Sequence, residues 1–334
     1  MNTPTKKIVV IYHRADFDGI FCREIARKFL GDEGVEYIGW DYKDAQLAFP
    51  HEAEIVYVLD LSPECFWESP LRDEWRQKLV WIDHHKSAIE KFRSDISGWR
   101  VDGVAACRLV WQYFWLERQA IEREPNEVIH RIVFPNKPDF IDRKVDEPWA
   151  VRLAGEHDVW DHRDPDALLF QSGMRSREIT ERDWAEMLEL DRTGSVSDVE
   201  AMVEAGVTGV LKPDGTLKNH IVIGLLRGGK CIQYSMDQAA AEKVRENGYI
   251  VEFEGLKFLT LNTSGKGSSQ FAARDLPETG HDALLKYHFN GHHWEFSLYH
   301  ARHRTDLDLS IIAVKHGGGG HRGACGFKTE KLPF

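Results

Sequence analysis

The stretch at residues 80–87, VWIDHHKS, sets the fold and poses the functional question. The apolar run at 79–82 has the length of a short buried strand, and it ends abruptly in Asp83, His84 and His85. A continuous apolar run bounded by polar residues is typical of a strand that is covered on both faces. Open α/β sheets bind their ligands at the carboxyl ends of such strands. Other strands that end in similar side chains would therefore contribute to the same site.

Two further predicted strands also end in acidic or imidazole side chains. Residues 7–13, KIVVIYH, are followed by RADFDG, so that His13, Asp16 and Asp18 lie at or just beyond the strand end. Residues 54–61, EIVYVLDL, carry Asp60 at the corresponding place. Three strands thus place Asp or His at one edge of the predicted sheet.

Several carboxylates that are buried together are costly unless a cation neutralises them. Imidazole and carboxylate ligands without thiolate suit Mn²⁺, Fe²⁺, Zn²⁺, or Mg²⁺ assisted by water. There are too many ligands for one tetrahedral ion, whereas a pair of ions about 3.5–4 Å apart would use them all. The sequence therefore predicts a metal site at this edge.

Each of these residues also has a simpler interpretation when it is taken alone. Asp16 or Asp18 could cap the helix that follows the first strand. Asp60 could be a turn residue, and His84 or His85 could be a core histidine. The coincidence of all three strand ends favours the metal site.

The composition narrows the class of protein. With 334 residues, 42% hydrophobic and 29% charged, the chain is long enough for two globular domains. No apolar run reaches membrane-spanning length, and the net charge of −11 argues against binding to long duplex nucleic acid. The five cysteines are scattered and none forms a Cys-x-x-Cys pair, which favours a reduced, cytoplasmic protein. The oligomeric state is left open.

Strands and helices alternate in the first part of the chain, which predicts an α/β fold with a largely parallel sheet and helices on both faces. Residues 206–219 are rich in Gly, Pro and Asp and are predicted to link a domain at 1–205 to a smaller α/β domain at 220–334, across a cleft. The expected strands are 7–13, 35–40, 54–61, 79–82, 249–254, 258–262, 283–289 and 294–300. The expected helices are 18–30, 69–78, 101–131, 181–190, 196–204, 237–247 and 307–316.

The motifs, taken in order, resemble those of the DHH phosphoesterase superfamily. They are HRADFDG at 13–19, then Asp60, then Asp83-His84-His85, and Asp158 in GEHDVWD at 155–161 matches the family's fourth motif. GGGGHRGACGF at 317–327 and NTSGKGS at 262–268 resemble the DHH-associated domain. The resemblance spans nearly the whole chain.

The resemblance implies roles for individual residues. His13, Asp16 and Asp60 would hold one divalent ion, and Asp18, Asp60, His84 and Asp158 a second, with Asp60 shared. Mn²⁺ is the first choice, and Mg²⁺ or another divalent ion the alternative. As catalytic residues, Asp83 would orient an imidazole and His85 would face the substrate phosphate. Substrate binding falls to Gly318, Gly319, Gly320, His321, Arg322 and Arg302 in the second domain.

The expected function is a two-metal phosphodiesterase that hydrolyses short RNA or DNA oligonucleotides or small nucleotides, as an oligoribonuclease does. One alternative keeps the fold but changes the substrate to 3′-phosphoadenosine 5′-phosphate, cyclic dinucleotides, or polyphosphate and pyrophosphate. A second is a single-strand exonuclease. A third, from another class, is a nucleotide-binding sensor that has no activity, against which the intact set of ligands argues.

Overall fold

The computed structural model describes residues 7–67, 75–92, 96–123, 133–161, 163–190, 219–264, 280–301 and 303–334. The chain divides into two compact units, Met1–Leu226 (unit 1) and Arg227–Phe334 (unit 2). The helices predicted at 69–78 and 196–204 lie mostly or wholly outside the described residues, as do Arg302 and all of the predicted linker but Asn219. Among the described helices, none combines the length and the hydropathy that crossing a bilayer requires.

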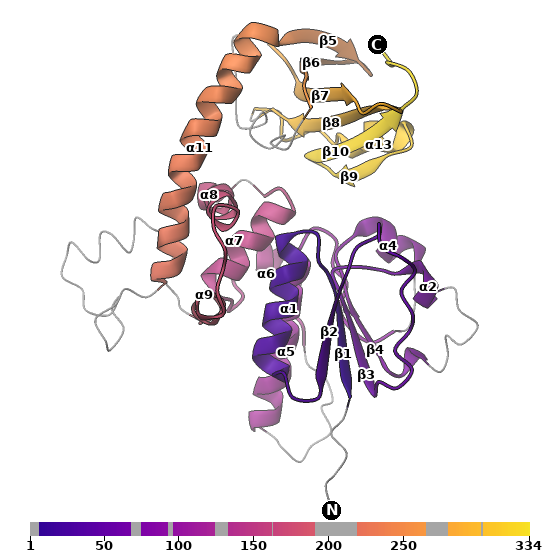
Figure 1. The fold of residues 1–334 in the computed structure, drawn as a ribbon, viewed down its shortest axis with the longest axis vertical. Helices are drawn as coiled ribbons and strands as arrows, with labels where there is room; N and C mark the ends of the chain where they lie inside the picture. The colour runs from indigo at the N-terminus through magenta and orange to yellow at the C-terminus, as the bar shows by residue number, and fades with distance from the viewer. Residues whose placement is uncertain are drawn as a thin grey trace, which may run out of the picture. The chain divides into compact units, whose positions relative to one another are not determined.

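Unit 1 is built on a parallel four-stranded sheet, in the order β2-β1-β3-β4 (Figure 1). Along β1, Val9 and Ile11 belong to one buried cluster, and Val10 and Tyr12 to another. Because successive side chains of a strand point to opposite faces, the sheet has a hydrophobic core on each side. The predicted parallel sheet is confirmed, with strands β1 (Ile8–His13), β2 (Val35–Trp40), β3 (Ile55–Leu59) and β4 (Leu79–Ile82).

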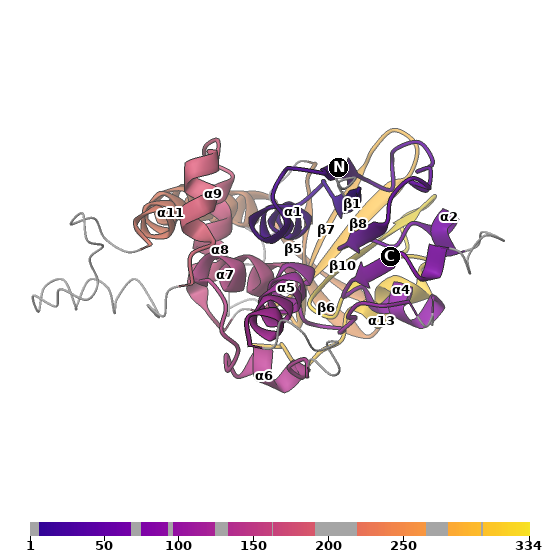
Figure 2. The same ribbon diagram turned by 90° about the horizontal axis from the view of Figure 1, so that it is seen from below.

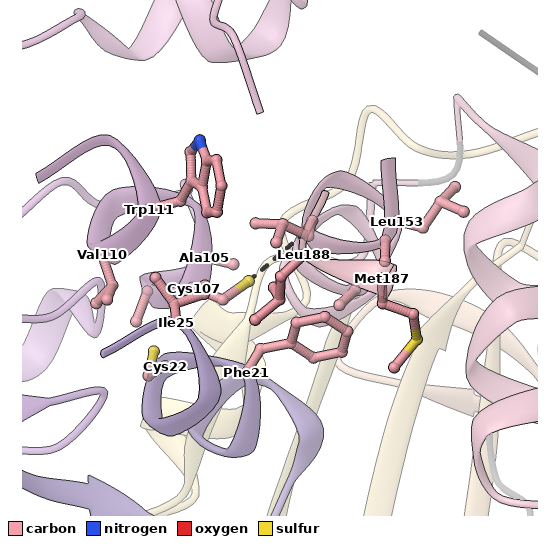
Figure 3. Packing of buried hydrophobic residues seen from close by; sticks show 14 of the residues in the cluster. Phe21, Cys22, Ile25, Ala105, Cys107, Val110, Trp111, Leu153, Met187 and Leu188 are labelled. Carbon is pink, nitrogen blue, oxygen red and sulfur yellow. Dashed lines mark hydrogen bonds between the residues drawn. The ribbon is translucent and has the colours of Figure 1, made fainter. Parts of the chain in front are cut away.

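Helices cover both faces of this sheet, as predicted. Figure 3 shows one core, where Phe21 and Ile25 of α1 lie beside Cys107 of α5 and beside Met187 and Leu188. The shorter helices α2 and α4 lie over the other face (Figure 2). Phe49, Phe66 and Trp75 belong to the buried cluster on that face. Among the described residues, the helices that lie wholly within this unit are α1 (Phe17–Leu30), α2 (Glu64–Trp67), α4 (Lys86–Lys91), α5 (Ala106–Arg123), α6 (Lys137–Ile141), α7 (Trp149–Asp158), α8 (Pro165–Met174) and α9 (Glu181–Met187).

Unit 2 contains a mixed six-stranded sheet in the order β5-β6-β7-β8-β10-β9. All its neighbouring strands are antiparallel except β6 and β7. Helix α13 covers part of this sheet. Leu309, just before the helix, and Ala313, within it, pack with the strand residues Phe296 and Phe327. The elements are β5 (Tyr249–Phe253), β6 (Leu256–Asn262), β7 (Ala283–Phe289), β8 (Trp294–His300), α13 (Ser310–Lys315), β9 (Gly319–His321) and β10 (Ala324–Thr329).

Helix α11 (His220–Asn247) is much longer than the predicted helix at 237–247. It includes Gly224 and Gly228, residues that weaken a helix interior. The division between the units falls inside it, after Leu226. Its first turns are buried in the core of unit 1 through Val222, Ile223, Leu225 and Leu226. That burial offsets the low helix propensity of the glycines.

Candidate metal centre

The carboxyl ends of β1, β3 and β4 are level with one another. Tyr12 is the register partner of Leu59, and Leu59 is the partner of Ile82. The next residue on each strand therefore falls in one row, and those residues are His13, Asp60 and Asp83. Parallel pairing in this register is what brings together motifs that are far apart in the sequence.

A first group of ligand atoms forms at the end of β1. His13 Nδ1 lies 3.1 Å from Asp16 Oδ2 and 3.6 Å from Asp60 Oδ2. Asp16 also caps α1, because its Oδ1 accepts the Gly19 backbone N–H at 3.1 Å. Both interpretations of Asp16 from the sequence are therefore compatible. Gly19 is required here, since a Cβ at that position would lie 1.9 Å from the carbonyl oxygen of His13.

A second group surrounds His84, which is almost fully buried. Its Nε2 lies 3.3 Å from Asp60 Oδ1, 3.3 Å from Asp158 Oδ2 and 3.5 Å from Asp18 Oδ2. Asp158 comes from the last turn of α7, a helix that the sequence pattern did not predict. Asp60 thus faces the first group with one carboxylate oxygen and the second group with the other.

In the metal-free cluster, burial and the charges of neighbouring side chains determine which groups are protonated. Burial, together with Asp60 and Asp158, raises the pKa of Asp18 well above its usual value. Burial likewise raises the pKa of Asp158 to about 7. Burial would also raise the pKa of Asp60, but the neighbouring His13 and His84 outweigh it and lower that pKa. Of these three carboxylates, Asp60 is therefore the one whose ionised form the surroundings favour.

The two histidines respond to the same carboxylates. Burial lowers the pKa of His13, but Asp16 and Asp60 outweigh it and raise that pKa to about 10. Burial also opposes charge on His84, yet its carboxylate neighbours raise its pKa well above the usual value. The cluster thus holds protons where a divalent cation would supply the compensating positive charge.

The donor atoms fit divalent cations. Among the described residues, three sets of ligand atoms lie within 4.8 Å of one another: His13, Asp16 and Asp60; Asp18, His84 and Asp158; and Asp60, His84 and His85. Two of the buried oxygens, Asp60 Oδ1 and Asp158 Oδ2, accept no hydrogen bond from the described residues. Buried acceptors without donors are unfavourable, and a cation would satisfy them. Carboxylate oxygens and imidazole nitrogens without thiolate suit Mn²⁺ or Mg²⁺ better than a soft metal.

Asp83 organises the turn that carries both histidines. Its Oδ1 accepts the backbone N–H of His84 at 2.7 Å and of His85 at 3.2 Å, and lies 2.8 Å from His85 Nδ1. The imidazole that Asp83 orients is therefore that of His85. The His85 side chain is 40% exposed, and its Nδ1 lies 3.9 Å from Asp60 Oδ1. It is the accessible imidazole at the edge of the cluster.

Backbone donors that no motif marks hold Asp18 in place. Its two carboxylate oxygens accept the N–H groups of Ala106 at 2.9 Å and Cys107 at 2.8 Å, at the start of α5. Cys107 Sγ in turn donates to the Val151 carbonyl of α7 (Figure 3). Sequence analysis missed this support because backbone amides carry no side-chain signature.

The glycine-rich segment of unit 2 is a helix cap followed by a strand. Gly317 has a φ of 76° and donates its N–H to Val314, while Gly318 donates to Ala313, which is the Schellman arrangement at a helix end. Gly319–His321 then form β9, at the edge of the sheet. The N–H of Gly318 is therefore engaged within the fold, in contrast to the free donor that the sequence suggested.

Two more of the predicted substrate-binding residues are placed by the structure. The Arg322 guanidinium donates to the backbone carbonyls of Leu307, at 3.0 Å, and Asp306. Arg322 thus secures the segment before α13. His321 is half-buried at the end of β9.

No family model matches the chain, and no curated protein matches its sequence. Among solved structures, the pGpG-specific phosphodiesterase PggH from Vibrio cholerae is 14% identical, with 97% of this chain and 94% of that chain covered and a TM-score of 0.44. The DHH domain of a member of the s1p family of ribosomal proteins is 14% identical, with 96% and 82% covered and a TM-score of 0.47. RecJ from Thermus thermophilus, solved with Mn²⁺, is 15% identical, with 97% and 49% covered and a TM-score of 0.44. In its ordered motifs and in the side chains that they bring together, the chain resembles the DHH phosphoesterase superfamily.

Proposed function

We propose that this chain is a phosphoesterase that depends on two divalent metal ions, with Mn²⁺ as the first choice. The observation that carries the proposal is the position of Asp60. One of its oxygens lies 3.6 Å from His13 and the other 3.3 Å from His84, so it can serve both groups of ligands. A carboxylate shared between two cations is suited to in-line displacement at phosphorus.

Each part of the site has a task in this reaction. His13, Asp16 and Asp60 hold one ion, and Asp18, Asp60, His84 and Asp158 hold the other. Bound divalent ions lower the pKa of water and offset the charge on phosphoryl oxygens. The His85 imidazole, held by Asp83 at 2.8 Å, donates a hydrogen bond or a proton to the leaving oxygen or to a nonbridging oxygen.

For the substrate, we propose a short oligonucleotide or a small nucleotide, as an oligoribonuclease would take. The net charge of −11 supports this choice, because a long strand needs many cationic contacts to bind tightly. Within unit 2, Gly319, Gly320 and His321 are the candidates for contact with the substrate. The N–H of Gly318 is left out, since it caps α13.

The deciding experiment incubates the purified protein and Mn²⁺ with dinucleotides, five-mers, cyclic dinucleotides, 3′-phosphoadenosine 5′-phosphate and pyrophosphate. We expect hydrolysis of dinucleotides that stops when the metal is chelated and that is lost in Asp60→Asn. Arg118→Gln, which removes an exposed ion pair with Glu122 on α5, is the control that should remain active. If a Mn²⁺-loaded protein hydrolysed none of the panel, the proposed reaction would be wrong.

The role of His321 has its own test. His321→Ala should raise KM for a dinucleotide and leave Mn²⁺ binding unchanged, because His321 belongs to unit 2 and the metal ligands belong to unit 1. His84→Ala should lose metal and turnover together. If His321→Ala lost metal and kept its KM, substrate binding would have been assigned to the wrong unit.

A further inference from the structure

Tyr42 lies beside the candidate metal centre, in the turn that follows β2. Its ring centroid is 6.0 Å from that of the His13 imidazole, at an interplanar angle of 64°. It also lies 5.1 Å from the ring of Trp40, at 67°. Both are edge-to-face arrangements, which are favourable for aromatic pairs. No motif in the sequence marks Tyr42.

The Tyr42 side chain is held in one position. Its hydroxyl oxygen accepts the backbone N–H of Ser62 at 2.9 Å, and Ser62 is a buried residue two positions after Asp60. The turn itself is fixed by Asp44, which accepts the N–H of Asp41 at 2.9 Å and pairs with Arg14. An aromatic side chain anchored in this way loses little further freedom when a ligand binds it.

The same ring is exposed to solvent. Tyr42 is 53% exposed, and of the Phe, Trp and Tyr side chains of unit 1 whose burial the structure describes, it is the only one in the exposed class. Since its hydroxyl is turned toward Ser62, the surface that it presents is the ring. A rigid, exposed aromatic ring beside a phosphate-handling site is the form that stacking platforms for nucleobases take.

We propose that the Tyr42 ring stacks against the base of the nucleotide whose phosphate lies at the metal centre. The inference rests on the proposed function and assigns it a residue for substrate recognition. Stacking is tolerant of base identity, because every base has a π-face. Tyr42 therefore selects nucleotides over phosphoesters that lack a base, with weak preference among bases.

Two mononucleotide-sized probes separate the base from the phosphate. Calorimetric titration of the Mn²⁺-loaded protein with AMP and with ribose 5-phosphate needs no turnover, so it is independent of the hydrolysis assay. We expect AMP to bind wild type about 5- to 100-fold more tightly than ribose 5-phosphate, which is the usual range for stacking of one base. Tyr42→Leu should remove this preference, whereas Tyr42→Phe, which keeps the ring and loses the Ser62 anchor, should retain most of it.

The controls distinguish stacking from shielding of His13. Ile121→Ala alters a residue of unit 1 with a similar exposure, 54%. Ile121 lies near the C-terminal end of α5, whose N-terminal end holds Asp18, and this variant should leave both affinities as in wild type. Equal affinities of wild type for AMP and ribose 5-phosphate would overturn the proposal. An unchanged preference in Tyr42→Leu, with a loss of Mn²⁺ affinity, would overturn it too, because Tyr42 would then act on His13. Absence of hydrolysis by a protein that shows the AMP preference would count against the proposed reaction and not against the stacking.

Discussion

Asp60 has a backbone φ of 59°, in a region that residues other than glycine rarely adopt. It is also almost fully buried, and its backbone N–H donates to the Ile82 carbonyl at the end of β4. A residue held in this region costs about 1–3 kcal/mol and persists where the surroundings determine its position. Here the strained backbone conformation places one carboxylate oxygen near each group of ligands, so the strain serves the geometry of the metal centre.

Asp60→Asn should weaken Mn²⁺ binding more than a change at any other ligand. Asparagine keeps the size and tolerates a positive φ, but it removes the negative charge and replaces one of the two oxygens with an NH₂ donor, so that one group loses its acceptor. We expect Mn²⁺ affinity to fall by more than about 10- to 100-fold, the loss that is typical when only an outer partner of a ligand is removed. Calorimetric Mn²⁺ titration measures this. Asp16→Asn, which touches one group, is the matched comparison, and a larger loss there would refute the shared role.

Binding of Mn²⁺ should release protons at pH 7. In the metal-free protein, Asp158 has a pKa of about 7 and His13 a pKa of about 10, so both hold protons at this pH in part or in full. Metal ligands must be deprotonated, so these protons compete with the ion. Mn²⁺ affinity should therefore rise as the pH increases from about 6 to about 8. Calorimetry in two buffers with different ionisation enthalpies counts the protons released, and a flat affinity over this range would contradict the assignment.

At the scale of elements, the first turn of α5 determines where two ligands lie. Its backbone amides at Ala106 and Cys107 hold Asp18, and Cys107 Sγ donates to α7, which carries Asp158. Arg108, in the same turn, pairs with Glu147, with its Nε 2.9 Å from a carboxylate oxygen. The turn contains no ligand, yet it fixes the carboxylates of the second group relative to each other.

Gly155→Ala tests this contact between α5 and α7. A Cβ at Gly155 would lie 2.7 Å from Cδ and Cγ of Arg108, and the ion pair with Glu147 restrains that side chain. We expect a loss of about 1–3 kcal/mol in the free energy of unfolding, as for other overpacked sites, together with weaker Mn²⁺ binding. Urea denaturation and Mn²⁺ titration measure the two effects.

Gly228→Ala is the control, because it changes another helical glycine where a Cβ would meet nothing within 4 Å. This variant should gain about 0.5–1 kcal/mol from the better helix propensity of alanine and keep its Mn²⁺ affinity. If the Gly155 and Gly228 variants behaved alike, the contact between α5 and α7 would have no part in positioning the ligands.

The elements also show what a sequence can and cannot reveal. The strands before His13, Asp60 and Asp83 were predictable because a buried parallel strand is a continuous apolar run, which is a local signal. Helix α7 was not predicted, although Asp158 was found through a motif. Helix α7 contains the fully buried Glu156, whose carboxylate lies 2.9 Å from Arg143 Nε. A local window of sequence does not reveal a tertiary ion pair of this kind.

The same limit applies to the glycine run of unit 2. Four successive glycines suggested free backbone donors, but the structure uses the first two to end α13 and the next two in β9. Gly320 is needed for pairing, since a Cβ there would lie 2.7 Å from Cys325 Cα. Composition indicates backbone freedom, whereas only the fold reveals which hydrogen bonds that freedom serves.

At the scale of the whole molecule, charge bears on the length of the substrate. The chain carries 43 Lys and Arg against 54 Asp and Glu, a net charge of −11. Binding of single strands gains from each phosphate that a cation neutralises, with a salt dependence of about −0.7 per contact on a log–log scale. A protein with few such contacts gains little from phosphates beyond those next to the metal centre, and the net negative charge repels the rest.

We therefore expect kcat/KM to be highest for strands of two to about five nucleotides and to decline for longer ones. Two differently labelled substrates, a dinucleotide and a 24-mer, can compete in one tube with Mn²⁺ and wild-type protein. The dinucleotide should disappear first, and the salt dependence of its kcat/KM should be shallow, because only one or two phosphates are contacted. Equal or faster consumption of the 24-mer, with a steep salt dependence, would instead indicate an extended cationic track and a processive exonuclease.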